Sequence, residues 1–383
     1  MPSLLPNIDP DGLLEYSVVF TDRSLNSMSQ KFQGVMNDIS SCLKEVYQAV
    51  GVVVIPGGGT YGMESIARQF GDEKDVLVIR NGWFSYRWSE IFDKGNIAKS
   101  VTVMSASQQP AADHGGDNHQ APFAPAPIEQ VVAKITEQQP QLVCAPHVET
   151  SAGMVLSDDY IKAVSAAVHS YGGVFVLDCV ASGALWVDMR DLGVDVLLSA
   201  PQKGWSASPC SGLVMLSEHA IGVMEVTDAK SYVCDVKKWH AIMKAYENGG
   251  HAYHATMPTD ALAKFRDVML ETKAYGFEKV KQEQIALGEA IRKVCEMRGI
   301  KSVAAKGFQS PTVVVNFTQD DDMKSGAKFV KEGLQIAAGV PLECGEAADY
   351  KSFRIGLFGL DKLHNLDRSV SHFEQALDRV LAQ

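Results

Sequence analysis

Short apolar runs alternate with stretches of helical periodicity from about residue 51 to residue 217. Such runs, rich in Val, Ile and Leu and bounded by Gly, Pro or Asp, are typical of buried strands. Six are present: GVVVIPGGG (51–59), DVLVIRNG (75–82), QLVCAPH (141–147), GGVFVLDCV (172–180), VDVLLSAP (194–201) and SGLVMLS (211–217). Strands alternating with helices predict an α/β fold, a mostly parallel sheet between helices. Ligands bind at the carboxyl ends of such strands, so residues after each run are the candidates for chemistry.

The pattern changes near residue 260. A helical stretch over 261–299 is followed by the run TVVVNF (312–317), a helix over 324–339, the run FRIGLFG (353–359) and a last helix over 365–383. We therefore expect a large domain at 20–260 and a small α+β domain at 261–383. Residues 1–19 should pack near the small domain or at a dimer interface, and the Ala-, Pro- and Gly-rich segment 105–127 should be a surface loop.

Composition narrows the class of protein. The net charge of −11 argues against a nucleic-acid-binding surface. No apolar run approaches the roughly 20 residues that span a bilayer, and the N-terminus lacks the pattern of a signal peptide. The seven cysteines are scattered, without a C-x-x-C pair. Reduced thiols in a cytoplasmic protein account for that better than disulfides or a zinc site.

Three glycines in GGGTYGME (57–64) follow one predicted strand and precede a helix. Backbone N–H groups at a helix N-terminus bind anions, phosphate above all. A plain strand-to-helix turn explains the glycines equally well.

Two side chains that could take part in a reaction follow later strands of the same predicted sheet. Asp178 ends the fourth run and Lys203 follows the fifth, 25 residues later, which is one strand–helix–strand step (203 − 178). Alone, Asp178 could be a helix cap and Lys203 a solvated loop residue. Together with the glycine loop they suit pyridoxal 5′-phosphate (PLP): a Schiff-base lysine, an acid on the pyridine nitrogen and a phosphate cradle.

At this point the sequence resembles the class V aminotransferases of PLP fold type I, the alanine–glyoxylate and serine–pyruvate group. The motifs that carry the resemblance are PGGGTYGMES, RNGWFSYRW, PHVETSAGM, VLDCVAS, APQKG, YHATMP and FRIGLFG, and they extend over almost the whole chain. The resemblance implies a seven-stranded large-domain sheet, a smaller C-terminal domain and a homodimer.

The resemblance also assigns a role to individual residues. It implies that Lys203 carries the cofactor, that Asp178 holds the ring nitrogen and that Arg354 grips the substrate carboxylate. The other cofactor-binding residues that it implies are Gly58, Gly59, Thr60 and Gln202 at the phosphate, Val180 under the ring, Thr150 or Ser151 near O3′, and Tyr253 and Thr256 reaching the neighbouring subunit's phosphate.

This chain departs from the family pattern in two places. Alignment puts Phe84 on the outer face of the ring, but Trp83 beside it would also serve. The segment EYSVVFTDRSLNSMS (15–29) replaces a Pro-Gly-Pro-type loop, which leaves the amino-acid specificity open; Arg23 in that segment is best interpreted as a surface residue.

Other candidates have plainer interpretations. His114, Asp117 and His119 lie in a polar loop without a second ligand cluster, so no metal site is expected. Cys344 lies in LECGEA, where neighbouring carboxylates would raise its thiol pKa, so a desulfurase is a minor alternative.

The function expected from the resemblance is ping-pong transfer of an amino group from a small, alanine- or serine-like L-amino acid to glyoxylate or pyruvate. Three alternatives stay open. They are a PLP-dependent lyase or desulfurase, an aminophosphonate transaminase, and a non-catalytic phosphate- or nucleotide-binding protein.

Overall fold

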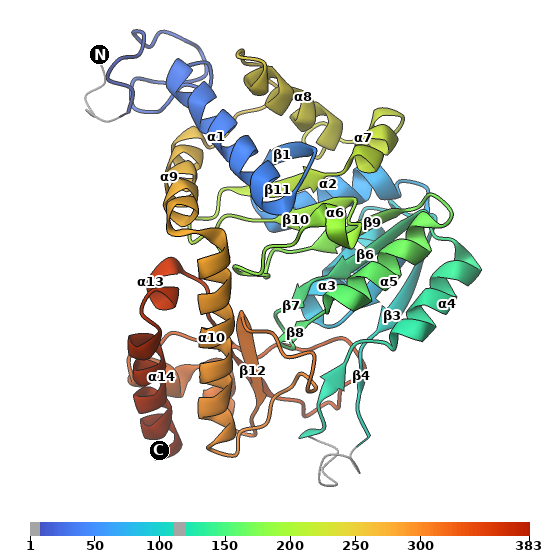
Figure 1. The fold of residues 1–383 in the computed structure, drawn as a ribbon, viewed down its shortest axis with the longest axis vertical. Helices are drawn as coiled ribbons and strands as arrows, with labels where there is room; N and C mark the ends of the chain where they lie inside the picture. Colours follow the sequence, from blue (N-terminus) through green and yellow to red (C-terminus); the bar gives the residue numbers. More distant parts are fainter. Residues whose placement is uncertain (1–7, 111–119) are drawn as a thin grey trace.

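A seven-stranded sheet forms the centre of the computed structural model, which describes residues 8–110 and 120–383 (Figure 1). The strands lie in the order β1-β11-β10-β9-β6-β2-β3. Their bounds are β1 Gly51–Pro56, β2 Asp75–Arg80, β3 Ser100–Ser105, β6 Leu142–Pro146, β9 Val174–Asp178, β10 Val196–Ser199 and β11 Ser211–Leu216. All six apolar runs therefore contain a strand of this sheet.

Strand direction brings six carboxyl ends to one edge. Neighbouring strands from β3 across to β10 pair in parallel. Only β11 is reversed, because it pairs antiparallel with both β10 and β1. The predicted α/β fold with a mostly parallel sheet is confirmed.

Strand β3 has no counterpart among the predicted runs. It lies at the edge of the sheet, and its residues are exposed or half-buried. An edge strand has a neighbour on one side only, so its sequence, SVTVMS, needs no continuous apolar run. Strand β1, at the other edge, is buried nearly throughout.

Helices surround the sheet, and local sequence signals explain where several of them begin. Ser29 and Ser157 each cap a helix, their hydroxyl oxygens accepting the backbone N–H groups of Phe32 and Tyr160. The helices are α1 Gln30–Tyr47, α2 Gly59–Gly71, α3 Trp83–Lys94, α4 Ile128–Gln138, α5 Asp158–His169, α6 Met189–Leu192, α7 Glu218–Glu225 and α8 Val236–Glu247. Two short hairpins add β4 Ser107–Gln108 with β5 Phe123–Ala124, and β7 Val148–Glu149 with β8 Met154–Val155. Among the described helices none is long and apolar enough to cross a membrane.

The predicted helix over 261–299 is two helices. They are α9 Thr259–Tyr275 and α10 Phe277–Glu296, separated by Gly276 at a φ of 105°, a conformation that favours glycine. Both run along one side of the molecule toward the C-terminal sheet (Figure 1).

The predicted helix over 324–339 is wrong in extent. Gly326, at a φ of 86°, separates α11 Asp321–Ser325 from α12 Ala327–Lys331, and residues 337–338 form a strand. That strand, β13 Ala337–Ala338, belongs to a three-stranded sheet in the order β12-β14-β13, with β12 Val313–Phe317 and β14 Ser352–Gly356. Helices α13 Leu360–Leu363 and α14 Leu366–Leu381 end the chain.

Hydrophobic packing separates the central sheet from the C-terminal part. One buried cluster surrounds the seven-stranded sheet, and a second joins α10, α14 and the three-stranded sheet through side chains such as Leu287, Phe353 and Leu377. The boundary near residue 260 stays a prediction, since α9 contributes Leu262, Phe265 and Met269 to the first cluster.

Trp205 links the loop after β10 to three helices. Its indole is fully buried, and its ring centroid lies 4.8 Å from that of Trp186. Further rings lie around it at centroid distances of 6.0 to 6.4 Å: Phe277 of α10, Phe265 of α9 and Tyr47 of α1. This cluster fixes the loop that carries Lys203.

We predict that Trp205→Ala lowers the free energy of unfolding by about 3–5 kcal/mol, because it empties the centre of this cluster. Trp205 Nε1 has no hydrogen-bond partner within the described part of the chain, so Trp205→Phe should lose packing alone and cost clearly less. Urea denaturation of both variants checks this. Equal losses in the two variants would contradict the role given to ring volume.

Candidate active site

The carboxyl edge of the large sheet gathers most of the side chains singled out from the sequence. They form groups that follow different strands. Gly58, Gly59 and Thr60 follow β1, Phe84 follows β2, Thr150 and Ser151 follow β6 and β7, Asp178 and Val180 stand at the end of β9, and Gln202 and Lys203 follow β10.

The glycine loop is built to receive an anion. Gly57 has a φ of 122°, and Gly58 is the N-cap of α2. The N–H groups of the first turn have no partner inside the helix, so they point at whatever lies beyond its end. A Cβ on Gly59 would come within 2.9 Å of Val180 Cγ2, so the loop packs directly against a residue two positions after Asp178.

Asp178 is half-buried at the end of β9 and holds a proton unusually well. Burial raises its pKa to about 6, and the nearby Glu149 carboxylate adds to the rise. The hydrogen bond that Val180 N–H donates to its Oδ1 (3.0 Å) and the Arg87 charge oppose the rise without cancelling it. A carboxyl group in this position would regain its charge beside a cation.

Lys203 has the opposite perturbation. Burial lowers the pKa of its amine, and the positive charges of Arg354 and Arg87 lower it further. Its Nζ lies 5.2 Å from the centre of the Phe358 ring, and among the described carboxylates none is within ion-pair distance of it. Such an amine becomes neutral, and hence nucleophilic, at lower pH than a surface lysine.

Two guanidinium groups lie near the ring of Phe84. The Cζ atoms of Arg87 and Arg354 are 5.0 Å and 5.4 Å from its ring centroid. Arg354 comes from β14 of the C-terminal sheet, where its Nε donates to the carbonyl of Ala338 (2.8 Å). Trp83 instead packs against Tyr86. The site therefore collects three cations, Lys203, Arg87 and Arg354, that form no ion pair with any described carboxylate.

Glu149 organises this edge, and sequence reasoning missed it. The side chain is fully buried, and its two carboxylate oxygens accept the backbone N–H groups of Phe84 and Ser85 at the start of α3 (3.2 and 2.9 Å). They also receive the hydroxyls of Ser85 and Ser151 (both 2.7 Å). A buried anion at a helix N-terminus is stabilised by the helix dipole. A Glu after an apolar run, flanked by Thr150 and Ser151, was the only signal of it in the sequence.

The two hydroxyls that the sequence left as alternatives differ in the structure. Ser151 Oγ accepts the N–H of Trp83 (2.9 Å) and donates to Glu149, so this hydroxyl already has hydrogen-bond partners within the protein. Thr150 is nearly buried and its hydroxyl makes no hydrogen bond among the described residues. The Oε1 atom of Gln202, a hydrogen-bond acceptor, is buried and has no partner among residues 8–110 and 120–383.

Tyr253 and Thr256 lie elsewhere on the surface of this subunit. Tyr253 is 59% exposed, and its hydroxyl pairs with that of Thr256 at 3.3 Å. Arg23 is exposed, as expected. His114, Asp117 and His119 lie outside the described residues, and within those residues no group of His, Cys, Asp and Glu is arranged to hold a metal ion.

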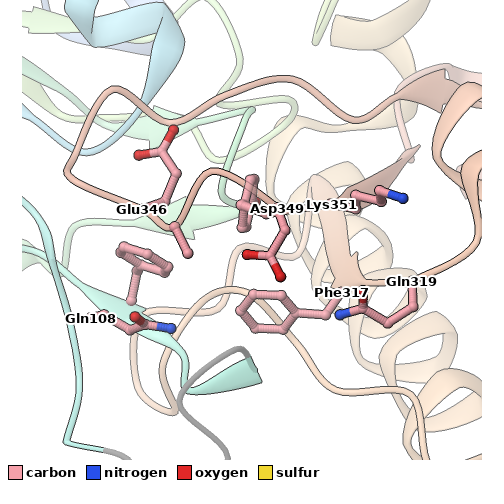
Figure 2. A pocket seen from close by; sticks show the side chains of 9 residues that line it. Gln108, Phe317, Gln319, Glu346, Asp349 and Lys351 are labelled. Atoms are coloured by element: carbon pink, nitrogen blue, oxygen red, sulfur yellow. The ribbon is translucent and has the colours of Figure 1, made fainter.

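A small hollow lies apart from these side chains (Figure 2). Its volume is about 10 Å³, and Gln108, Phe317, Gln319, Glu346, Asp349 and Lys351 line it. That is room for about one water molecule. The Glu346 carboxylate is already used by backbone N–H groups, among them that of Cys344 (2.9 Å), so this hollow is structural.

Fold and site together define an enzyme that holds a phosphorylated carbonyl cofactor at the edge of an α/β sheet. Comparison with known proteins agrees. The family model described as "Aminotransferase class-V" matches residues 14–349. Alanine–glyoxylate aminotransferase 1 of Saccharomyces cerevisiae is 27% identical over 275 residues, which span 67% of this chain and 66% of the yeast protein.

Two further comparisons cover more of the chain. The 2-aminoethylphosphonate–pyruvate transaminase of Vibrio parahaemolyticus is 24% identical over 85% of this chain and 83% of its own length. The crystal structure of an alanine–glyoxylate aminotransferase from Nostoc sp. superposes with a TM-score of 0.74 at 22% identity, over 90% of this chain and 87% of that one. This chain belongs to the class V aminotransferases, and it is an enzyme whose cofactor is PLP.

We predict that Glu149→Gln lowers the free energy of unfolding by about 2–4 kcal/mol, because an amide nitrogen would face N–H and O–H donors in a buried site. Chemical denaturation measures the loss. Asp93→Asn, an exposed change on α3, should change stability by less than about 0.5 kcal/mol. A loss below about 1 kcal/mol for Glu149→Gln would count against the network.

The raised pKa of Asp178 makes a pH-dependent prediction for the cofactor-free protein. Because the folded state binds this proton more tightly than the unfolded chain, Asp178 destabilises the fold above a pH of about 6, and the cost disappears as the pH falls toward 4. Asp178→Asn should therefore stabilise the cofactor-free protein by up to about 3 kcal/mol at pH 8 and have little effect at pH 4.

Thermal unfolding across that pH range tests this prediction. Asp93→Asn, an exposed change on α3, serves as the control. A stabilisation that does not vary with pH would show that charge burial is not the cause.

Proposed function

We propose that this enzyme transfers the amino group of a small L-amino acid to a 2-oxo acid, glyoxylate or pyruvate, in two half-reactions at one site. The observation that carries the proposal is Lys203: a partly buried amine of lowered pKa at the sheet edge, without a carboxylate partner among the described residues. A structural lysine would be paired or solvated. An amine of lowered pKa that lies near two further cations suits covalent attachment of an anionic cofactor.

The residues at the edge fit PLP. The first-turn N–H groups of α2, with Gly58, Gly59 and Thr60, would receive the phosphate, and the amide nitrogen of Gln202 would donate to it. Asp178 would hold the protonated ring nitrogen, a cation that would return its carboxylate to the charged form. Val180 and Phe84 would cover the two faces of the ring. We assign the O3′ contact to Thr150, because the hydroxyl of Ser151 is used by Glu149.

When bound, PLP supplies an aldehyde carbon that reacts with amines and a ring that accepts electrons. The chain's own part is to move protons and to orient the substrate. Lys203 Nζ, once released from the cofactor, would take the proton from the substrate Cα as a general base and later return it. Its lowered pKa raises the fraction that is neutral and able to do so.

Arg354 would orient the substrate. Its Nε is fixed by the Ala338 carbonyl, and its two Nη groups make no hydrogen bond among the described residues. A planar fork with two free donors matches a carboxylate. The same fork would also match a phosphonate, which keeps aminophosphonate transamination as the second candidate, favoured by the similarity to the Vibrio protein.

A desulfurase is a weaker candidate. The Cys344 thiol lies close to the Arg80 and Leu342 carbonyls, and burial raises its pKa to about 12, with Glu149 and Glu346 adding to the rise. A nucleophilic cysteine needs a lowered pKa. The non-catalytic alternative has no support, because the chain belongs to a family of enzymes.

We further propose a homodimer that works in the cytoplasm on an amino acid and a 2-oxo acid, with neither nucleic acid nor membrane as a partner. The exposure of Tyr253 and Thr256 in a single subunit supports a role at a partner's phosphate site. All seven cysteines are free, which fits a reducing compartment.

We expect the purified enzyme with PLP to absorb at the edge of the visible range and to convert pyruvate or glyoxylate into an amino acid only when an amino donor is present. Lys203→Ala should lose both the absorbance and at least about 10³-fold in kcat, while Cys344→Ser should keep both. A panel of donors, including alanine, serine and 2-aminoethylphosphonate, would identify the substrate. Turnover without any 2-oxo acid would point to a lyase and overturn the proposal.

A further inference from the structure

We propose that Arg87 binds the phosphate group of the cofactor from within its own subunit, adding a cation to a loop that otherwise offers N–H groups and hydroxyls. The inference rests on the proposed function of the same site. Arg87 lies on α3, three residues after Phe84, so both side chains leave the same face of the helix. It was not among the residues singled out from the sequence.

Geometry places the Arg87 guanidinium at the phosphate loop. Its Nη1 donates to Thr60 Oγ1 at 3.2 Å. Thr60 is the second residue of α2, in the turn whose backbone N–H groups have no partner in the helix. The positive charge therefore stands beside the end of a helix that already attracts anions.

The missing ion-pair partner of Arg87 also supports a contact with phosphate. In the part of the chain that the structure describes, Arg87 makes no ion pair. Its contacts are a neutral hydroxyl and the face of Phe84. By contrast, Arg68 at the other end of α2 is paired with Glu64 at 2.7 Å. A phosphate would give the planar Arg87 guanidinium an anionic partner whose oxygens can accept two of its N–H groups.

A contact with phosphate would also relieve a repulsion inside the site. Arg87 and Arg354 both act on Lys203, and their charges favour its neutral form. A dianion beside Arg87 would screen one of the two cations from the amine, leaving Arg354 free for the substrate carboxylate. Arg87 would then serve the cofactor and Arg354 the substrate, as two anion sites near the same aromatic ring.

The competing explanation is structural, since Arg87 could serve only to pack on Phe84. Binding of PLP and of pyridoxal, which lacks the phosphate, separates the two explanations. The experiment uses the full chain freed of cofactor and titrated with each ligand by absorbance and tryptophan fluorescence. Variants are Arg87→Met, Arg87→Lys and, as a control for net charge, Lys94→Met on the exposed end of the same helix.

We expect Arg87→Met to weaken PLP binding by roughly 10- to 100-fold, in line with loss of a hydrogen bond between charged groups, and to change pyridoxal binding by less than about twofold. Arg87→Lys should fall between wild type and Arg87→Met, and Lys94→Met should resemble wild type. Inorganic phosphate should compete with PLP in the wild type and clearly less in Arg87→Met.

Two outcomes would overturn the inference: equal weakening of PLP and pyridoxal, which indicates packing on Phe84, or no change in either. Thermal unfolding of each variant shows whether it is folded. The proposed function fails separately, if the wild type binds PLP but does not transaminate.

Discussion

The common direction of the strands is the constraint on which this molecule depends. Because β1, β2, β6, β9 and β10 all end at one edge, side chains far apart in the sequence reach one place without long connections. Only β11 runs the other way, and it returns the chain across the sheet directly after the loop of Lys203. The candidate site residues thus lie on short turns that begin at the ends of buried strands, the arrangement in which loops carry function on a rigid scaffold.

Electrostatic imbalance is the second organising feature. Three cations lack carboxylate partners among the described residues, while Asp178 lies close by in an environment that favours its neutral form. The unpaired cations alone, or the buried Asp178 carboxyl alone, would reduce the stability of the fold. Their coexistence is understandable if the fold is completed by a ligand that carries both an anion and a cation. Stability of the free chain and affinity for that ligand then oppose each other at the same residues.

The sequence predicted the parts of this structure that depend on local pattern. Asp178 and Lys203 were recognisable because each follows an apolar run, and the glycine loop because glycines precede a helix. Strand β3 and the breaks at Gly276 and Gly326 were missed, since an edge strand and a helix break depend on what packs beside them. The hydrogen bonds of Glu149 were invisible for the same reason, because their donors lie 64 and 65 residues away in sequence.

The hairpin that carries Lys203 has a consequence for how the enzyme moves. Residues 200–210 connect two strands that pair with each other, and Ala207 N–H bonds the Pro201 carbonyl at 3.0 Å within them. The backbone beneath the lysine is therefore closed at both ends and cross-linked inside. In the role proposed above, Lys203 would pass from one partner to another by rotation about its own side-chain bonds. No loop rearrangement would then need to accompany each turnover, because only the Lys203 side chain moves while its backbone stays fixed.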